Sequence, residues 1–207
     1  MHVDKIIVRA ALTTFAVVLT LCVFMIVALS FVFPSTMMQI TYDMGMNAVS
    51  AKYAHRAYSY SGDVYYAAFA TEVSILDGDV EKVAEYGKLL IADDEFATYC
   101  DARNAQKPPL VVGTYEQYVY GQVYSAEYVG LQTVAEKALV INKAFASIDE
   151  VGFPQGNAVA TIVIAAKKKG DNETLRAIRE QMNDIDKSSL SVEDSARFDD
   201  VFALTNG

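Results

Sequence analysis

The feature that most constrains this chain is an uninterrupted apolar segment near its N-terminus. From Ala10 to Phe33 the sequence reads AALTTFAVVLTLCVFMIVALSFVF, 24 residues without one charge. As an α-helix with a rise of about 1.5 Å per residue, this segment would be about 36 Å long, enough to cross a hydrocarbon core of about 30 Å. Fourteen of its residues are Leu, Ile, Val or Phe, each of which favours insertion by roughly 0.3–0.6 kcal/mol near the helix centre. We therefore expect a transmembrane helix over residues 10–33, ended by Pro34.

A cleaved signal peptide is the main alternative for this segment. Its apolar region would span only about 7–15 residues and end in a small-x-small site. The nearest candidate, Ala28-Leu29-Ser30, lies within continuing hydrophobic residues. The pattern favours an uncleaved signal anchor, with a buried core helix as a third alternative.

The charges that flank the apolar segment predict its orientation. Lys5 and Arg9 precede it, and the first basic residue after it is Lys52. Because basic residues collect on the cytoplasmic side of membrane helices, residues 1–9 are predicted to be a short cytoplasmic tail. Residues 35–207 then form a soluble domain on the other side, in a single-pass protein of the cell membrane.

The predicted soluble domain is strongly acidic. Beyond Pro34 the chain has 15 basic and 25 acidic residues. A surface of this charge repels phosphate backbones, which argues against a nucleic-acid partner. The one basic run, Lys167-Lys168-Lys169, is most simply a solvated helix end.

The domain has the pattern of an all-α fold built from helical hairpins. After Pro34, proline occurs only at positions 108, 109 and 154, and apolar residues recur at spacings of three and four. Ser35 and Thr36 can cap the helix that follows Pro34. The segment 93–112 breaks the helical pattern, and its Lys107-Pro108-Pro109 is the clearest loop in the chain. The predicted helices are Thr36–Tyr60, Val64–Leu76, Val80–Ile91, Tyr115–Tyr128, Leu131–Ser147, Asn157–Lys169, Glu173–Ile185 and Val192–Leu204.

Two of these hairpins resemble tetratricopeptide repeats. The stretch GDVEKVAEYGKLLIADD (Gly78 to Asp94) has a Gly-Asp turn followed by a helix with a small residue inside it, and GDNETLRAIREQMNDID (Gly170 to Asp186) follows the same pattern. The first helices lack the Trp, Leu-Gly and Tyr positions of that family, Glu95 stands where its terminal Pro would be, and the two turns are 92 residues apart, which is not a multiple of 34. The resemblance implies an irregular α-solenoid with a concave surface that binds a peptide or a partner protein.

The sequence contains no recognisable catalytic, cofactor-binding or metal-binding constellation. Only two histidines occur, His2 and His55, and HExxH, GxSxG, Walker-type and GxGxxG motifs are absent. The acidic clusters 93–95 and 199–200 lack the ligand spacing of a calcium loop and fit solvated faces. Cys22 lies in the apolar segment, so Cys100 has no disulfide partner and is expected to be a small, partly buried hydrophobic residue.

Tyrosine is the residue with the most unusual distribution. Five tyrosines lie between positions 53 and 66, and five more lie between 115 and 128. Tyr120, Tyr124 and Tyr128 are spaced by four residues and share one face of a predicted helix. They either fill the seams between helix pairs, with the hydroxyl at the rim, or line a groove for a peptide or glycan partner.

Two functions are consistent with this reading. The first is a membrane-anchored helical-repeat domain that acts as a protein-interaction or scaffold module in the cell envelope, with Tyr120, Tyr124 and Tyr128 as the candidate partner-binding residues. The second is an envelope enzyme, or a subunit of one, with a site that the sequence does not reveal. An ordered polar pocket with converging carboxylates would favour the second.

Overall fold

The structure is a computed structural model, and it describes residues 2–106, 114–151, 153 and 157–206. Within these ranges every regular element is helical, which confirms the expected all-α class. The elements are α1 (His2–Val32), α2 (Pro34–Asp43), α3 (Asn47–Ser61), α4 (Val64–Asp77), α5 (Val80–Ile91), α6 (Phe96–Ala105), α7 (Tyr115–Gly130), α8 (Val134–Val151), α9 (Ala158–Lys169), α10 (Asn172–Asn183), the 3₁₀ helix η1 (Lys187–Ser189) and α11 (Val192–Leu204).

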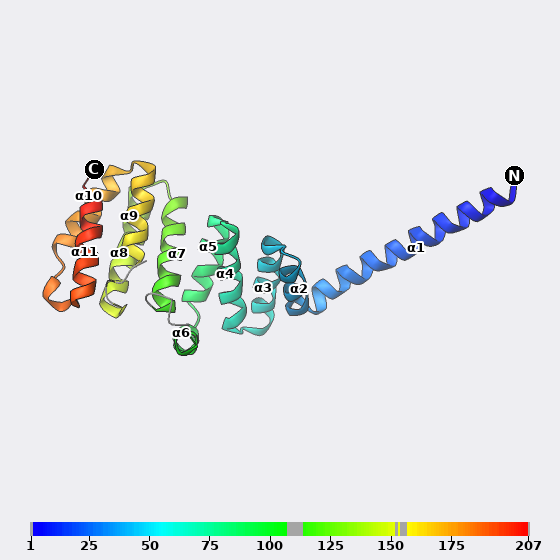
Figure 1. Cartoon of the computed structure of the whole chain (residues 1–207), viewed down its shortest axis with the longest axis horizontal. Helices are drawn as coiled ribbons and strands as arrows, with labels where there is room; N and C mark the ends of the chain where they lie inside the picture. Colours follow the sequence, from blue (N-terminus) through cyan, green and yellow to red (C-terminus); the bar gives the residue numbers. More distant parts are fainter. Residues whose placement is uncertain (1, 107–113, 152, 154–156, 207) are drawn as a thin grey trace.

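Helix α1 stands apart from the other helices. Its segment Ile7–Leu29 is long and apolar enough to cross a membrane, judged by length and composition. None of this segment is buried against the rest of the chain, and α1 extends from one end of the helical array (Figure 1). The hydroxyls of Thr13 and Thr20 donate to the carbonyls of Arg9 and Ala16, one turn earlier. These polar groups are therefore satisfied inside the helix, as an apolar environment requires.

The helix after Pro34 does not have the expected side-chain cap. Pro34 occupies the first turn of α2, where its missing N–H costs nothing, and the position before it is Phe33, which makes no side-chain cap. The prediction that Ser35 and Thr36 cap this helix is therefore wrong. The Phe33 N–H donates to Leu29 O at 2.8 Å, and the Met37 N–H donates to Phe33 O at 3.1 Å. Backbone hydrogen bonds thus continue through the junction.

The segment predicted as one helix over Thr36–Tyr60 is in fact the pair α2 and α3. Gly45 lies between them with φ 72°, a left-handed conformation that glycine adopts without steric cost. The buried Ser50 hydroxyl donates to Met38 O at 2.8 Å and ties α3 to α2. The break lacks a proline, so the helical periodicity of the sequence runs through it.

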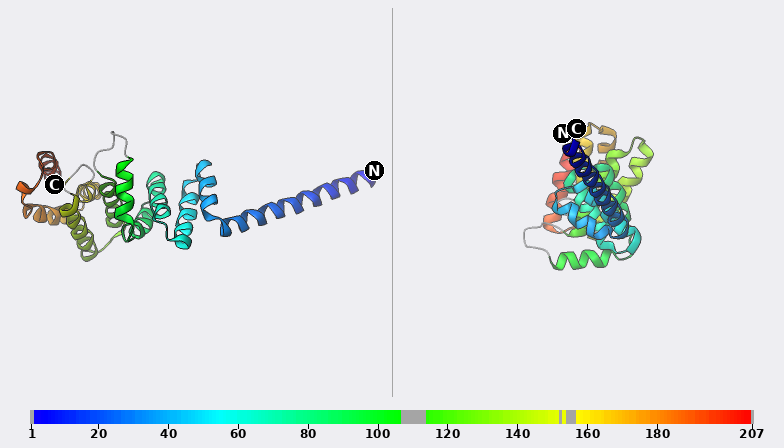
Figure 2. Two further views of the ribbon diagram at one scale, coloured as in Figure 1. Left: turned by 90° about the horizontal axis from the view of Figure 1, so that it is seen from below. Right: turned by 90° about the vertical axis from the view of Figure 1, so that its right-hand side faces the viewer.

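The helices beyond α1 form a row of antiparallel pairs, which are α2 with α3, α4 with α5, α7 with α8, and α9 with α10, followed by α11 (Figures 1 and 2). First helices of successive pairs contact each other. The rings of Tyr42 and Phe69 join α2 to α4 at 5.2 Å between centroids, and the Thr161 hydroxyl donates to Gly121 O at 2.8 Å between α9 and α7. The second helices of the first two pairs also contact each other, since the rings of His55 of α3 and Tyr86 of α5 stack at 4.7 Å.

Helix α6 lies within the segment 93–112, where the helical pattern of the sequence breaks and no helix is predicted. It is an additional helix between the second and third pairs, seen end-on at the bottom of Figure 1. Its Phe96 and Cys100 are buried in one core cluster with Val119 and Val123 of α7. Apolar burial therefore stabilises a segment that lacks a side-chain cap at its N-terminus. Residues 107–109 lie outside the described residues.

The predicted Gly-Asp turns are present. Gly78 and Gly170 adopt φ 72° and 68°, and each following aspartate caps the next helix, with Asp79 accepting from the Lys82 N–H and Asp171 from the Thr174 N–H. Side-chain caps of this kind each contribute about 1 kcal/mol. Helices α4 and α11 are also capped by side chains at their N-termini, by Asp63 and Ser191.

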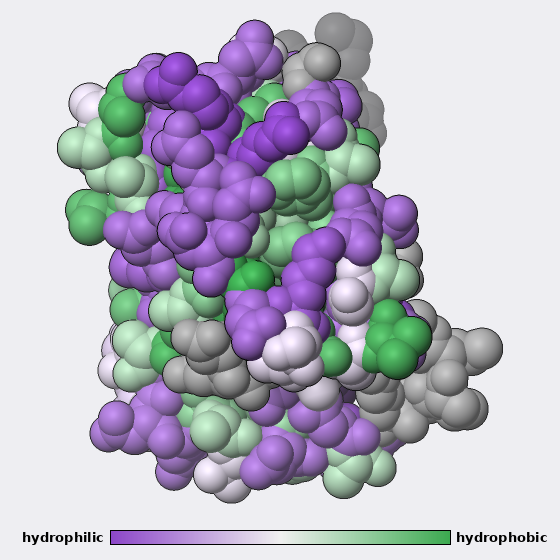
Figure 3. Space-filling view, turned by 90° about the vertical axis from the view of Figure 1, so that its left-hand side faces the viewer, coloured by the Kyte–Doolittle hydropathy of each residue, from purple (hydrophilic) through white to green (hydrophobic). Residues whose placement is uncertain are grey.

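The core is a chain of three clusters rather than one centre. They lie between α2, α3, α4 and α5, between α4, α5, α6 and α7, and between α7 and the helices that follow it. Gly87 of α5 provides the closest approach, since a Cβ built there would lie 2.2 Å from Val123 Cγ2 of α7. The C-terminal end of the row is covered largely by hydrophilic side chains, with apolar ones between them (Figure 3).

Candidate binding surface

The tyrosines singled out from the sequence lie mostly between helices. The rings of Tyr120 and Tyr124 stack at 5.7 Å between centroids with an interplanar angle of 5°, and both are half-buried against the C-terminal core. The Tyr128 side chain is fully buried. It offers no surface to a partner, whereas binding by Tyr120 and Tyr124 stays a prediction.

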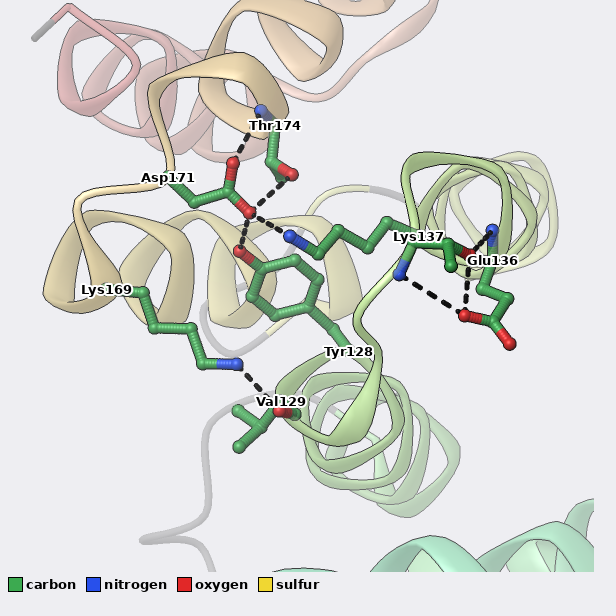
Figure 4. A network of polar contacts seen from close by, with 8 residues as sticks. Tyr128, Val129, Glu136, Lys137, Lys169, Asp171 and Thr174 are labelled. Atoms are coloured by element: carbon green, nitrogen blue, oxygen red, sulfur yellow. Dashed lines mark hydrogen bonds and ion pairs between the residues drawn. The ribbon is translucent and has the colours of Figure 1, made fainter.

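Tyr128 belongs to a polar network that joins three helices (Figure 4). Its hydroxyl donates to Asp171 Oδ2 at 2.7 Å, and Lys137 Nζ lies 2.6 Å from the same oxygen. The Thr174 hydroxyl donates to Oδ2 at 2.9 Å, and the Thr174 N–H donates to Oδ1 at 3.1 Å. The end of α7, the start of α8 and the turn between α9 and α10 therefore meet at one carboxylate.

The electrostatics of this network are those of a structural junction. Burial alone would raise the pKa of Asp171, but the hydrogen bonds from Lys137, Tyr128 and Thr174 outweigh it and hold that pKa well below its ordinary value. Burial and the bond to Asp171 raise the pKa of Tyr128. The carboxylate is therefore ionised and fully engaged at neutral pH, which leaves it unsuited to proton transfer.

A second network lies at the start of α7 and centres on Glu72 of α4. The Tyr115 hydroxyl donates to Glu72 Oε1 at 2.7 Å, and Arg103 Nη2 of α6 donates to the same oxygen at 3.0 Å. The Arg103 guanidinium also lies 5.3 Å from the centre of the Tyr115 ring, which is a cation–π distance. Helices α4, α6 and α7 are thus held together by one carboxylate and one guanidinium.

More tyrosines surround Glu72, and two of them face solvent. Tyr65 of α4 and Tyr118 of α7 are 42% and 41% exposed. The ring of Tyr99 packs edge-on against Tyr115 at 5.8 Å, and Tyr118 lies 6.3 Å from Tyr115. Burial and the charge of Glu72 raise the pKa of Tyr99 to about 12 and also raise those of Tyr65 and Tyr118. These hydroxyls therefore stay protonated and able to donate hydrogen bonds at neutral pH.

The face of α7 that carries Tyr118 continues into a groove. Gln122, Ser125 and Val129 follow Tyr118 at helical spacing on this face. Together with α9 they form an open groove of about 430 Å³, lined by Gln122, Ser125, Val129, Thr161, Ile164, Ala165, Lys168 and Lys169. We call Tyr65, Arg103, Tyr118 and this groove the tyrosine face.

The remaining candidates for chemistry are placed as follows. His55 stacks on Tyr86, and Cys100 is completely buried, which raises the pKa of its thiol to about 12. Asp93 accepts a hydrogen bond from the Tyr58 hydroxyl at 2.8 Å. In the part of the chain that the structure describes, no group of three or more His, Cys, Asp or Glu side chains could hold a metal ion.

The tyrosine face was missed by sequence reasoning because it depends on α6. Tyr99 and Arg103 lie in the segment where the helical pattern of the sequence breaks. Glu72 lies 43 residues from Tyr115, whose hydroxyl donates to it. One signal was available, since the spacing of Tyr115 and Tyr118 places these two residues one turn apart on α7.

No family model, no curated protein and no solved structure matches this chain in the comparisons with known proteins.

Proposed function

We propose that this chain is a membrane-anchored scaffold in the cell envelope, in which α1 holds a tetratricopeptide-like array at the membrane and the array binds a protein or peptide partner through the tyrosine face. The observation that carries the proposal is the set of partly exposed Tyr65, Tyr118 and Arg103 side chains, next to a groove, with Arg103 fixed by its ion pair with Glu72.

The chemistry of this face is that of a protein interface rather than of a solvated helix surface. Tyrosine and arginine are enriched among the residues that dominate protein–protein affinity. Tyrosine supplies a large contact area with few rotatable bonds, and both side chains can donate hydrogen bonds. Arg103 is fixed by its ion pair with Glu72 at 3.0 Å and by the Tyr115 ring. A partner therefore meets a preorganised side chain, and this lowers the entropic cost of binding.

The groove gives the face a direction. It runs between α7 and α9, from the turn after Tyr118 toward Lys168 and Lys169 at the end of α9. The exposed Ile164 side chain lies in its wall. An extended peptide that places an aromatic or apolar side chain against Ile164 and an acidic one near Lys168 would match this lining.

Site-specific photocrosslinking in native membranes tests the proposal. A photoreactive phenylalanine analogue at position 118 is expected to form a discrete adduct with the partner. The same analogue at Leu139, which is exposed on α8, is expected to form none. The change Arg103→Ala should then abolish the adduct at position 118, while the helical content measured by circular dichroism is retained.

Two outcomes would contradict the proposal. Equal adduct patterns at positions 118 and 139 would show that the tyrosine face has no preference for a partner. Adducts at position 118 that persist unchanged in Arg103→Ala would show that the ordered arginine does not contribute.

The alternative of an envelope enzyme gains no support from the described residues. Glu72 and Asp171, the carboxylates at the centres of the two networks described above, belong to different junctions and do not converge. Each is already occupied by hydrogen-bond donors of the chain itself.

A further inference from the structure

The end of the array nearest α1 carries apolar side chains that no other helix covers. Ile40 lies on α2, Phe33 and Met44 flank this helix at its two ends, and Met46 follows in the turn to α3. All four are exposed, and Met44 reaches 68%. We call these four residues the end face. The opposite side of α2, with Met38 and Thr41, is buried in the array, so the end face points outward.

The position of the end face relative to α1 is fixed by contacts. Backbone hydrogen bonds continue from Leu29 through Phe33 into α2. The Arg56 guanidinium of α3 lies 4.7 Å from the centre of the Phe31 ring. Helix α1 leaves from the α2 end and runs away along the length of the array (Figures 1 and 2). A bilayer crossed by α1 would therefore lie directly opposite the end face.

The distance along the chain agrees with this placement. The membrane-compatible segment ends at Leu29, and α1 ends three residues later at Val32. At the helical rise of about 1.5 Å per residue, the step from Leu29 to Phe33 is only about 6 Å. That is within the headgroup layer, into which interfacial helices bury their apolar faces by about 5–10 Å. The end face thus begins where the hydrocarbon core ends.

Charge distinguishes this end of the array from the rest. Residues 34–61, which form α2 and α3, contain two basic residues, Lys52 and Arg56, and one acidic residue, Asp43. The 146 residues that follow contain 13 basic and 24 acidic residues. The hairpin next to α1 is therefore net positive, and the remainder of the array is strongly negative. Phosphate headgroups attract the first and repel the second.

From these observations we propose that the end face lies in the lipid headgroup layer, with Phe33, Ile40, Met44 and Met46 in contact with lipid and Lys52 and Arg56 near lipid phosphates. The array then stands end-on on the bilayer and carries the tyrosine face away from it. This inference rests on the proposed function in one respect, the insertion of α1 into a membrane.

Tryptophan scanning of the full-length protein in vesicles of phosphatidylcholine and phosphatidylglycerol tests the proposal, since the chain has no natural Trp. Three variants are compared: Met44→Trp in the end face, Phe24→Trp in α1, and Val192→Trp, which is 91% exposed at the start of α11. We expect Phe24→Trp and Met44→Trp to lose emission when the lipids carry bromine, and Met44→Trp to respond most to bromine near the headgroups. Val192→Trp should keep its emission, at a longer wavelength.

The variant Met46→Trp carries the same expectation as Met44→Trp and guards against a local effect of one substitution. A charge reversal, Lys52→Glu, should reduce the quenching of Met44→Trp. The matched control Lys143→Glu makes the same change on the exposed surface of α8 and should leave the quenching unaltered.

The failures of the two proposals are distinguishable. If Phe24→Trp is quenched and Met44→Trp behaves like Val192→Trp, the end face does not contact lipid although α1 does. If the emission of Met44→Trp shifts to shorter wavelength without quenching by brominated lipid, a protein surface covers the end face, and the lipid proposal is overturned. If Phe24→Trp itself escapes quenching, α1 is not inserted and both proposals fall.

Discussion

The close packing of α5 against α7 gives the sharpest test of the fold, through the substitution Gly87→Ala. A Cβ at this position would lie 2.2 Å from Val123 Cγ2, 3.0 Å from Cγ1 and 3.1 Å from Cβ. Carbon atoms in contact normally lie about 3.5–4.0 Å apart. Rotating Val123 does not resolve the clash, because its Cβ and second methyl group are also too close. The two helices must therefore separate.

The size of the effect follows from two opposing contributions. Overpacking of a core costs typically about 1–3 kcal/mol, and the number of close atoms places Gly87→Ala at the upper end of this range. Alanine is better than glycine inside a helix by about 1 kcal/mol. We therefore expect the free energy of unfolding to fall by about 2 kcal/mol, measured by thermal and urea unfolding of the full chain in detergent, followed by circular dichroism.

Two further variants show whether the clash is the cause. Gly130→Ala adds the same methyl group at the end of α7 with no atom within 4 Å, so it should leave stability unchanged or raise it. In Gly87→Ala combined with Val123→Ala, the two obstructing methyl groups are gone, and the loss should be smaller than the sum of the single losses. A Gly87→Ala protein at least as stable as the parent would refute the reasoning.

Three predictions concern the polar networks. Tyr128→Phe removes a buried donor to Asp171 and should lower the free energy of unfolding by about 1.5 kcal/mol, measured in the same unfolding experiments. Because folding lowers the pKa of Asp171, its interactions add stability above the unfolded pKa, and this stability is lost as the pH falls through the folded pKa. The Tm advantage of the parent over Asp171→Asn should thus shrink between neutral pH and about pH 3, and a constant advantage would contradict this. The pKa of Tyr115 is raised by burial and then by the charge of Glu72. In an alkaline absorbance titration, Tyr115→Phe should therefore show one fewer late-titrating tyrosine than the parent protein.

The helices with strong local signals were predictable from the sequence. Helix α5 is a clear example, since Asp79 caps it, Gly78 sets the turn before it, and its buried Val83, Tyr86 and Leu90 follow helical spacing. The apolar composition of α1 is equally informative. In both cases residues close in sequence determine the structure, so periodicity and caps are sufficient.

The helix boundaries that the sequence did not predict are α6 and the break between α2 and α3. Helix α6 lacks a side-chain cap and is stabilised by burying Phe96 and Cys100 against α7. The break between α2 and α3 rests on Gly45, which sequence periodicity does not distinguish from a tolerated helical glycine.

The candidate site was less predictable than the fold for the same reason. The abundance of tyrosine in the sequence directs attention to α7, the helix that carries Tyr118 of the tyrosine face. Which face of α7 is free was decided by its neighbours, because α8 and the C-terminal core cover Tyr124 and leave Tyr118 exposed. Which face of α7 stays exposed also depends on where α6 and α9 lie, and no local sequence pattern encodes their positions.

Cysteine accessibility in intact cells tests the central claim, an α1 anchor with the array outside. The natural thiols should give no background, because Cys22 lies in the apolar helix and Cys100 is buried with its pKa raised to about 12. We predict that a membrane-impermeant maleimide labels Val192→Cys in intact cells and labels His2→Cys only after permeabilisation, with both variants retained in the membrane after an alkaline wash. The reverse labelling pattern, or release of the protein by the wash, would contradict the account.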